Sequence, residues 1–596
     1  MQTLTRELSK YVNQAFVDAG YGDAYGTVKV SDRPDLADYQ CNDAMAVAKA
    51  QRCNPFDVAE AVSSRLQDCP AFSSVTVARP GFINIKVNDE YIASRMNEMR
   101  ADDNLGFVPC DDPCTIVVDY GGPNVAKPLH VGHLRSAIIG ETMKRLARFL
   151  GNNVIGDVHL GDWGLQMGLV ITEIKHRWPD LVYFRPDFVE GMDENLSISA
   201  EDLYNIYPTA SLKAKGDPDY MAEAQEATLM LQNRHPGYYA LWKNFMQISV
   251  RDLKASYAEL SVDFDVWYGE SDADEYVNDM VEGFISGGFA RESEGALVVD
   301  VADESDSAPM PPCLIRKSNG AMLYATTDLA TIVQRVKDYN PDKIWYLTDA
   351  RQTLHFDQVF RCAKKTGIVP ETLKFEYLPF GTMNGKDGKP FKTRDGGVMR
   401  LSDLIQMMHD AFADKSRNSA NVDSDETAAL GGINAEANEI ARLVGNAALK
   451  FGDMVNHRTK NYVFDLDKFM SFNGKTGPYL LYTVVRIQSV LRKAEERGLA
   501  CGPITAPCGD TERSLMLELS RCSSMLLSAY DEKAPNYICE SLFNCASIFN
   551  KFYFENRILD EADDARRGSW LTLLTLIRDI MKQQLWILGI DVPEKM

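Results

Sequence analysis

A short apolar stretch, a glycine- and proline-rich loop and an amphipathic helix follow one another between residues 115 and 150. Residues 115–120 (Thr-Ile-Val-Val-Asp-Tyr) are typical of a buried strand, and residues 121–124 (Gly-Gly-Pro-Asn) are typical of a loop. The apolar residues of 138–150 recur at helical spacing, and a new strand pattern opens at Val154. A strand–helix–strand unit of this kind predicts a parallel sheet in an α/β domain.

Segments much further along the chain have the same strand character. Residues 344–348 and 375–378 predict strands of the same sheet, whereas helical patterns such as 218–233 and 238–260 lie between the two halves. We therefore expect the long segment that begins near residue 171 to combine part of the sheet domain with a helical insertion. Residues 421–427 are polar and predict a loop.

Different patterns flank the sheet domain on either side. Before it, helical patterns over 3–19, 41–50 and 55–66 and an alternating strand over 82–87 predict an α+β domain. After about residue 435 the pattern is almost wholly helical, with runs at 436–450, 478–496, 511–530, 535–555 and 569–588. A chain of 596 residues has room for several cores. We expect three domains, which span residues 1–112, 113–434 and 435–596.

Charge and cysteine content narrow the classes of function. A net charge of −22 disfavours a general nucleic-acid binder, because nucleic acid is a dense anion, but a local basic groove would still accept one specific RNA. The twelve cysteines are scattered, and no second pair at zinc spacing accompanies Cys110 and Cys114, so we expect reduced thiols and no metal site. The chain has neither a long uninterrupted apolar run nor a signal-like start, which predicts a cytoplasmic protein without a membrane span.

Residues 130–133 (His-Val-Gly-His) are the strongest chemical signal, because they lie where the loop after a strand enters a helix. Helix-terminal N–H groups and the helix dipole favour an anion at that point. Gly132 lets a nucleotide approach the backbone, and the imidazoles of His130 and His133 can donate hydrogen bonds to phosphates. A metal-binding pair and two internally bonded loop histidines are the alternatives. The strand–loop–helix context favours a nucleotide.

Residues 119–136 (Asp-Tyr-Gly-Gly-Pro-Asn-Val-Ala-Lys-Pro-Leu-His-Val-Gly-His-Leu-Arg-Ser) resemble the nucleotide-binding segment of arginyl-tRNA synthetases, a class I aminoacyl-tRNA synthetase family. They contain the Pro-Asn-x-Ala-Lys that precedes the family's "HIGH" element and the Leu-Arg-Ser that follows it. Other similar segments occur in the family's order, at 80–84, 159–166, 323–328, 349–355, 444–451 and 477–482. The resemblance implies a multidomain α/β protein with a Rossmann-type parallel-sheet catalytic domain, an N-terminal α+β domain and a C-terminal all-helical anticodon-binding domain.

The resemblance implies an arginine–tRNA ligase, which forms arginyl-adenylate from L-arginine and ATP and transfers arginine to the 3′-terminal adenosine of tRNA(Arg). Its implied catalytic residues are His130, His133, Lys127 and Lys392, and the implied ATP-binding residues are Gly132, His130, His133, Lys389 and Lys392. Lys392 belongs to a degenerate form of the family's "KMSKS" motif, for which the resemblance implies that Lys127 compensates. The expected nucleotide is ATP with substrate-bound Mg²⁺, without a prosthetic group.

A guanidinium requires facing carboxylates, ideally in bidentate geometry. The resemblance implies an arginine-binding set of Asp119, Asn124, His159, Tyr324, Asp328 and Gln352, in which Asp119 and Asp328 are the acidic pair. For each aspartate a helix cap or a surface acid is the ordinary alternative. Asp119 differs because it ends a buried strand, at the edge where parallel sheets bind ligands. Gly121 and Gly122 depart from the family, which more often has serine before Pro-Asn.

The outer domains are implied to hold tRNA(Arg). Aromatic rings and guanidinium groups suit a single-stranded loop, and the implied tRNA-binding residues are Tyr479, Tyr482, Arg486 and Arg492. For the tyrosines, packing inside a helical core is an equal alternative. The expected partners are tRNA(Arg), L-arginine and ATP, and we expect a monomer.

Three other functions are alternatives. A different class I synthetase is disfavoured by the Pro-Asn-x-Ala-Lys segment and by the N-terminal domain. A small adenylyltransferase does not need the long helical C-terminal domain. A non-catalytic tRNA-binding paralogue would be free to lose His130, His133, Lys127 and the acidic pair, all of which are present.

Overall fold

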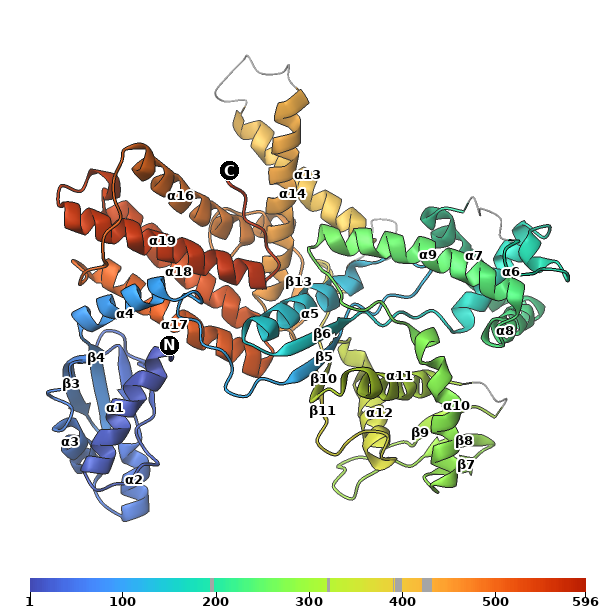
Figure 1. Ribbon diagram of the computed structural model, residues 1–596, viewed down its shortest axis with the longest axis horizontal. Helices are drawn as coiled ribbons and strands as arrows, with labels where there is room; N and C mark the ends of the chain where they lie inside the picture. The colour runs from blue at the N-terminus through green and yellow to red at the C-terminus, as the bar shows by residue number, and fades with distance from the viewer. Residues whose placement is uncertain (193–197, 319–321, 390, 392–398, 421–430) are drawn as a thin grey trace. The chain divides into compact units, whose positions relative to one another are not determined.

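The computed structural model describes residues 1–192, 198–318, 322–389, 391, 399–420 and 431–596, and only the backbone within 415–420 and 431–434. Lys392 and the loop predicted at 421–427 lie outside the described residues. The chain divides into two compact units, residues 1–110 with 471–587 and 591–596, and residues 111–470 with 588–590 (Figure 1).

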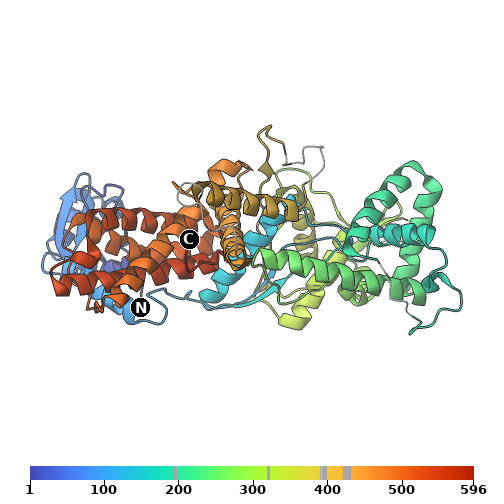
Figure 2. The same ribbon diagram turned by 90° about the horizontal axis from the view of Figure 1, so that it is seen from above.

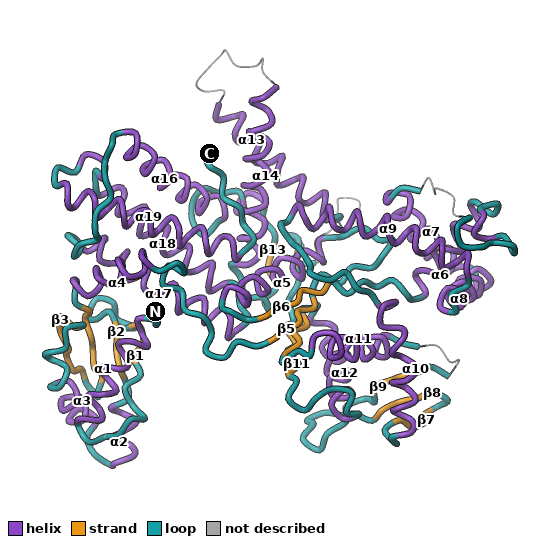
Figure 3. Tube along the Cα trace, in the orientation of Figure 1, coloured by secondary structure: helices purple, strands orange, loops and turns teal. Residues whose placement is uncertain are grey.

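A four-stranded parallel sheet lies at the centre of the second unit (Figures 1 and 3). Its strands, in spatial order, are β11 (Lys374–Tyr377), β10 (Lys343–Tyr346), β5 (Thr115–Asp119) and β6 (Asn153–Asp157). The strand register places Asp119 opposite both Tyr346 and Asp157, so polar side chains meet at the carboxyl edge. The predicted parallel sheet is confirmed.

Helix α5 (Val131–Phe149) connects β5 to β6 and packs directly on the strand that precedes it. A β-carbon at Gly140 would lie only 2.3 Å from Tyr120 Cγ, so the helix backbone presses on that ring. The hydroxyl of Ser136 accepts a hydrogen bond from the Gly121 amide and donates one to the Leu347 carbonyl. These contacts hold the beginning of α5 against the ends of two strands.

Helices and a small antiparallel sheet form a second core beside β10. They are α10 (Glu270–Ser286), β7 (Ala290–Ser293), β8 (Ala296–Val299), β9 (Cys313–Arg316), α11 (Tyr324–Tyr339) and α12 (Thr353–Lys365). Their buried side chains, among them Phe284, Leu329 and Val359, pack with Ile344 of β10. The sequence patterns did not predict β7, β8 and β9, which are four residues each and, in β7 and β9, include exposed positions.

The helical insertion consists of α6 (Leu165–Arg177), α7 (Ala200–Gly216), α8 (Pro218–Gln232) and α9 (Pro236–Glu259), of which α6, α7 and α8 lie side by side in Figures 1 and 2. The helices predicted at 218–233 and 238–260 are confirmed. Buried Glu173 of α6 forms ion pairs with Lys213 of α7 and with Arg177 of α6. Helices α13 (Leu401–Ala420) and α14 (Gly431–Met454) follow later in this unit.

The first unit combines a small antiparallel sheet with long helices. The sheet order is β1 (Val28–Val30), β2 (Tyr39–Cys41), β4 (Phe82–Val87) and β3 (Phe72–Ala78), and the helices are α1 (Leu4–Asp18), α2 (Ala44–Gln51), α3 (Pro55–Ser63), α4 (Asp89–Ala101), α16 (Gly477–Glu496), α17 (Asp510–Glu532), α18 (Asn536–Glu555) and α19 (Asp564–Ile587). Arg513 of α17 ion-pairs with Asp38 and Asp89. The predicted α+β and all-helical segments are confirmed. In the described part of the chain no helix is long and apolar enough to span a bilayer.

The close approach at Gly140 makes a packing prediction. We expect Gly140→Ala to lower the free energy of unfolding by about 1–3 kcal/mol, because the added methyl group meets the Tyr120 ring. Gly283→Ala is the matched control: this glycine lies inside α10 and a β-carbon there meets no atom within 4 Å. The control should gain about 0.5–1 kcal/mol from reduced backbone freedom. Chemical denaturation measures both, and equal effects of the two substitutions would contradict the close approach.

Candidate active site

The two histidines at the beginning of α5 bond to the backbone in a way that determines where their protons lie. His130 Nδ1 accepts a hydrogen bond from the Gly132 amide (3.0 Å), and His133 Nδ1 accepts one from the His130 amide (3.0 Å). Because both Nδ1 atoms are acceptors, the proton of each neutral ring lies on Nε2. The histidines therefore offer two Nε2–H donors beside a helix N-terminus, where an anion is favoured.

Burial keeps both rings neutral. It lowers the pKa of His133 to about 3, with further repulsion from His130 and Lys127. Burial and the Lys127 ammonium also lower the pKa of His130. Within the described ranges no group of three or more His, Cys, Asp or Glu side chains is arranged to hold a metal ion.

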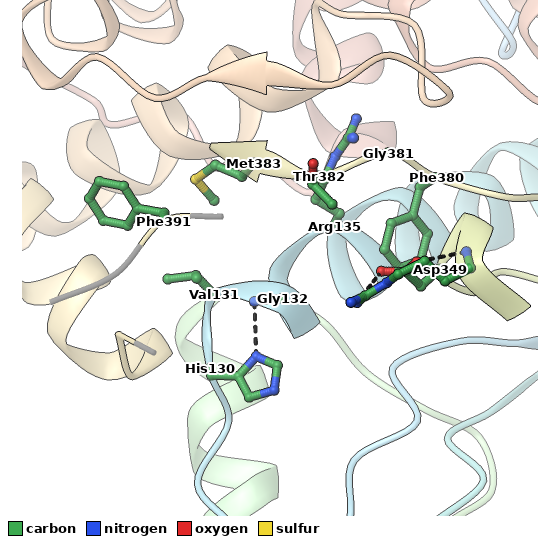
Figure 4. Close-up of a pocket in the computed structure, with 11 residues that line it drawn as sticks. His130, Val131, Gly132, Arg135, Asp349, Phe380, Gly381, Thr382, Met383 and Phe391 are labelled. Atoms are coloured by element: carbon green, nitrogen blue, oxygen red, sulfur yellow. Dashed lines mark hydrogen bonds and ion pairs between the residues drawn. The ribbon is translucent and has the colours of Figure 1, made fainter. Parts of the chain in front are cut away.

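A pocket of about 280 Å³ opens beside His130 (Figure 4). Its polar or charged lining includes His130, Asp349, Arg351 and Thr382. Its apolar lining consists of Val131, Phe380, Met383 and Phe391. An apolar slot next to imidazole donors suits a flat heteroaromatic ring that carries an anionic group.

The described residues on either side of 392–398 differ in their contacts. Beyond them, the Leu401 amide donates to the Leu129 carbonyl and the Val131 amide donates to the Met399 carbonyl, so this segment pairs with the histidine segment. Before them, Lys389 is exposed in a turn, where its carbonyl accepts from the Gly385 amide. Lys392 itself lies outside the described residues, so its predicted contact with ATP stays a prediction.

Lys127 lies between the sheet and the insertion. Its ammonium is 4.2 Å from the centre of the Tyr207 ring on α7. The preceding residue, Ala126, has a φ of 60°, and its amide donates to Ser249 on α9. The charge of the same ammonium lowers the pKa of both histidines, in addition to the larger effect of their burial.

A second polar cluster occupies the carboxyl ends of β5 and β6. Fully buried Arg335 of α11 donates to Asp119 (2.7 Å) and to Asp157 (2.6 Å). Burial raises the pKa of Asp119, whereas Arg335 and His159 oppose this shift. Asp119 therefore lies at the predicted strand edge, but one of its oxygens already binds an arginine of the protein.

Asp328, two turns before Arg335 on α11, shares its surroundings with an acid that the sequence patterns did not reveal. Glu270, at the start of α10, is 8% exposed, and burial raises its pKa with Asp328 adding repulsion and His159 opposing. The Asp328 carboxylate pairs with the His355 ring. Glu270 escaped prediction because an acid at a helix start is ordinarily a dipole partner.

The remaining residues predicted to bind arginine are His159, Asn124, Tyr324 and Gln352. His159, with a φ of 42°, keeps its buried Nδ1 without a partner, and the Asn124 backbone forms a bridge with Gly161 nearby. Tyr324 is 67% exposed as a residue, and partial burial of its hydroxyl, followed by the charges of Glu270 and Asp328, raises its pKa. Gln352 is exposed in a short 3₁₀ turn.

The Gly121-Gly122 departure has a backbone cause. Both residues have positive φ, 87° and 49°, which glycine adopts without steric cost. A side chain at Gly121 would also lie 2.9 Å from the Phe264 ring.

In the first unit, a pocket of about 780 Å³ collects most of the residues predicted to bind tRNA. Tyr482, Arg486 and Arg492 line it, whereas Tyr479 does not and its hydroxyl instead accepts a hydrogen bond from Asn550. The Arg486 guanidinium lies over the rings of Tyr482, Tyr553 and Phe554, at 4.6, 5.2 and 5.6 Å. Phe554, 77% exposed, was not predicted, because its helix otherwise reads as core.

Comparison with known proteins decides the family. Family models match the tRNA synthetases class I (R) catalytic domain at residues 96–466, the DALR anticodon binding domain at 480–596 and the arginyl tRNA synthetase N-terminal domain at 2–87. The arginine–tRNA ligases of Alkaliphilus oremlandii and Agathobacter rectalis are 48% and 49% identical to this chain, each over the full length of both proteins. The chain belongs to the arginyl-tRNA synthetase family.

Solved structures of the family share the fold. The arginyl-tRNA synthetases of Plasmodium falciparum and Thermus thermophilus superpose with TM-scores of 0.80 and 0.79, at 21% and 20% identity and over the whole of each chain. The Rossmann-type sheet, the N-terminal α+β segment and the C-terminal helices of this arginyl-tRNA synthetase are therefore the family architecture.

The neutral His133 of this arginyl-tRNA synthetase makes a pH prediction. Its folded pKa is about 3, below that of an unfolded histidine, so the unfolded chain takes up a proton first as the pH falls below about 6.5. Stability from this residue is complete above that pH and declines below it, by up to about 2 kcal/mol at pH 5. We expect His133→Asn, whose side-chain oxygen can still accept from the His130 amide, to lose less stability between pH 7 and pH 5 than the wild type. Denaturation at both pH values measures this, and equal losses would show that His133 titrates normally.

Proposed function

We propose that this arginyl-tRNA synthetase activates L-arginine at the α5 N-terminus and transfers it to tRNA(Arg). The arginine carboxylate attacks the α-phosphorus of ATP, and the bond to the bridging oxygen breaks to release pyrophosphate and leave arginyl-adenylate. A ribose hydroxyl of the terminal adenosine then attacks the arginyl carbonyl and AMP leaves. The observation that carries the proposal is the pair of neutral imidazole donors beside an apolar slot.

ATP occupies the slot beside α5 in this proposal. The adenine ring packs among Phe380, Met383 and Phe391, and the phosphates face Gly132 and the imidazole of His130, with the His133 ring 4.0 Å from it between ring centres. Neutral Nε2–H donors strengthen as negative charge builds on the phosphates, without the electrostatic cost of a buried cation. The lysines of this site are Lys127, Lys389 and Lys392, and Mg²⁺ arrives bound to the nucleotide.

Arginine occupies the cluster at the carboxyl edge. Asp328 and Glu270 are the carboxylates that we assign to the guanidinium, because Glu270 is buried, the Asp328 side chain is only 16% exposed, and the Asp328 charge repels Glu270 until a cation enters. Asp119 offers its second oxygen, since the first is held by Arg335. The other members of this pocket are Asn124, His159, Tyr324 and Gln352.

The helical pocket of the first unit receives the anticodon loop. Tyr482 and Phe554 present exposed rings for base stacking, whereas Arg486 and Arg492 supply positive charge. Tyr479 supports this surface from beneath through Asn550, which also accepts a hydrogen bond from Arg486. The N-terminal α+β segment holds another part of the tRNA.

The chain acts as a cytoplasmic monomer in this proposal. All twelve cysteines are free thiols, which fits a reducing compartment.

A charging assay tests the reaction. Purified protein, ATP, total tRNA and each of the twenty amino acids in turn should give charged tRNA with arginine alone. Arginine-dependent pyrophosphate exchange should be weak until tRNA is added, because the degenerate lysine loop needs tRNA to complete the phosphate site. Strong exchange with arginine in the absence of tRNA would contradict the second expectation.

Two neutralising substitutions test the arginine pocket. We expect Glu270→Gln and Asp328→Asn each to raise the arginine KM by about 5- to 150-fold, since roughly 1–3 kcal/mol is lost when a charged donor keeps no charged partner. The ATP KM should stay nearly constant, and the preference for arginine over lysine should narrow. Glu282→Gln, at an exposed position of the same helix α10, is the control for Glu270. An unchanged arginine KM for Glu270→Gln would remove Glu270 from the pocket.

A further inference from the structure

Helix α7 of the insertion turns one face toward the ATP site. Glu201, Tyr204 and Tyr207 recur every three residues, so they lie along the same side of the helix. Glu201 forms two hydrogen bonds with the Arg400 guanidinium (2.8 and 3.0 Å), and the Tyr204 hydroxyl bonds to Asp252. Tyr207 places its ring 4.2 Å from the Lys127 ammonium. Arg400 and Lys127 thus both contact this helix.

Arg400 belongs to the backbone pairing that adjoins the histidine segment. It forms a β-bridge with His130, between the hydrogen bonds of Met399 with Val131 and of Leu401 with Leu129. The Glu201–Arg400 ion pair is partly exposed, so by itself it adds little stability. Its two-point geometry nevertheless fixes the first turn of α7 beside the ATP site.

The Tyr207 ring holds the Lys127 ammonium without neutralising it. A carboxylate partner would cancel the positive charge, whereas the face of an aromatic ring attracts a cation and leaves its charge available to an anion. Lysine has a long, flexible side chain that loses much rotamer freedom when it is fixed. Lys127 lies three residues before His130 in the chain, and its charge lowers the pKa of both His130 and His133, so the ring holds a cation whose charge acts on the two imidazole donors.

We propose that Tyr207 is a positioning residue for arginine activation: its ring holds the Lys127 ammonium beside the histidines, where it meets the phosphates of ATP. The insertion therefore contributes directly to the chemical step, through a side chain that does not itself touch the reacting atoms. This inference rests on the proposed function, in which Lys127 stabilises the charge that develops on the phosphates.

Single-turnover formation of arginyl-adenylate, measured with full-length protein, tRNA(Arg), ATP and arginine, tests the proposal. Tyr207→Leu should slow this step by about 3- to 30-fold, the range expected when a partly desolvated cation–π contact is lost. The arginine KM should change by less than about twofold. Tyr207→Phe keeps the ring and should stay close to the wild-type rate. Leu212→Ala, at a 74% exposed position of the same helix, is the control for the integrity of α7.

A double-mutant cycle separates positioning from a structural role. Lys127→Ala should slow the step, and adding Tyr207→Leu to it should change the rate by less than about twofold, because the ring then has no cation to hold. An equal slowing by Tyr207→Leu with and without Lys127 would overturn the proposal, as would a normal rate for Tyr207→Leu alone. If Lys127→Ala itself reacted normally, the role of Lys127 in the proposed function would fail, and the role of Tyr207 with it. Thermal unfolding of each variant identifies a loss of folding.

Discussion

The buried guanidinium of Arg335 is the interaction on which the substrate-binding end of the sheet depends. It joins Asp119 of β5 to Asp157 of β6 and also contacts the Tyr346 hydroxyl of β10, so one side chain from α11 spans three neighbouring strands. A buried ion pair adds little net stability relative to apolar packing, but the loss of one partner leaves an uncompensated charge. The consequence is a fixed geometry: the strand ends, and the residues that follow them, hold one arrangement.

At the ATP site, which follows β5 in the chain, single hydrogen bonds also determine more than one feature of the structure. Each histidine of the α5 N-terminus accepts a backbone amide hydrogen bond through Nδ1. This bond places the ring proton on Nε2, orients the ring and caps the first turn of the helix. The ring orientation and the helix cap are therefore one structure. Because burial keeps the rings neutral, the histidines add no positive charge to this site, and the Lys127 ammonium is held by a ring of the insertion.

Local sequence patterns predicted the elements that carry strong periodicity. The strand at 115–120 and the helix that follows it were found, because an apolar run and a helical apolar face leave clear traces in a short window. The antiparallel strands β7, β8 and β9 were missed, since all three are short and β7 and β9 are partly exposed, whereas β10, of equal length, is a nearly continuous buried apolar run. The strand–loop–helix context pointed to His130, whereas family resemblance pointed to Lys127 and Asp328, and the comparisons confirm the family itself. Their individual roles remain predictions.

The sequence by itself determined the family, the parallel sheet and the placement of the histidines at a helix start, because each depends on residues close together along the chain. Only the tertiary structure decided which distant side chains meet. The Asp328 charge acts on Glu270, Arg335 occupies one oxygen of Asp119, and Tyr207 covers Lys127, across separations of 58, 216 and 80 positions in the chain. A short stretch of sequence does not predict such pairs. The burial of each side chain, and with it the protonation state, depends on the packing of elements that are far apart in sequence.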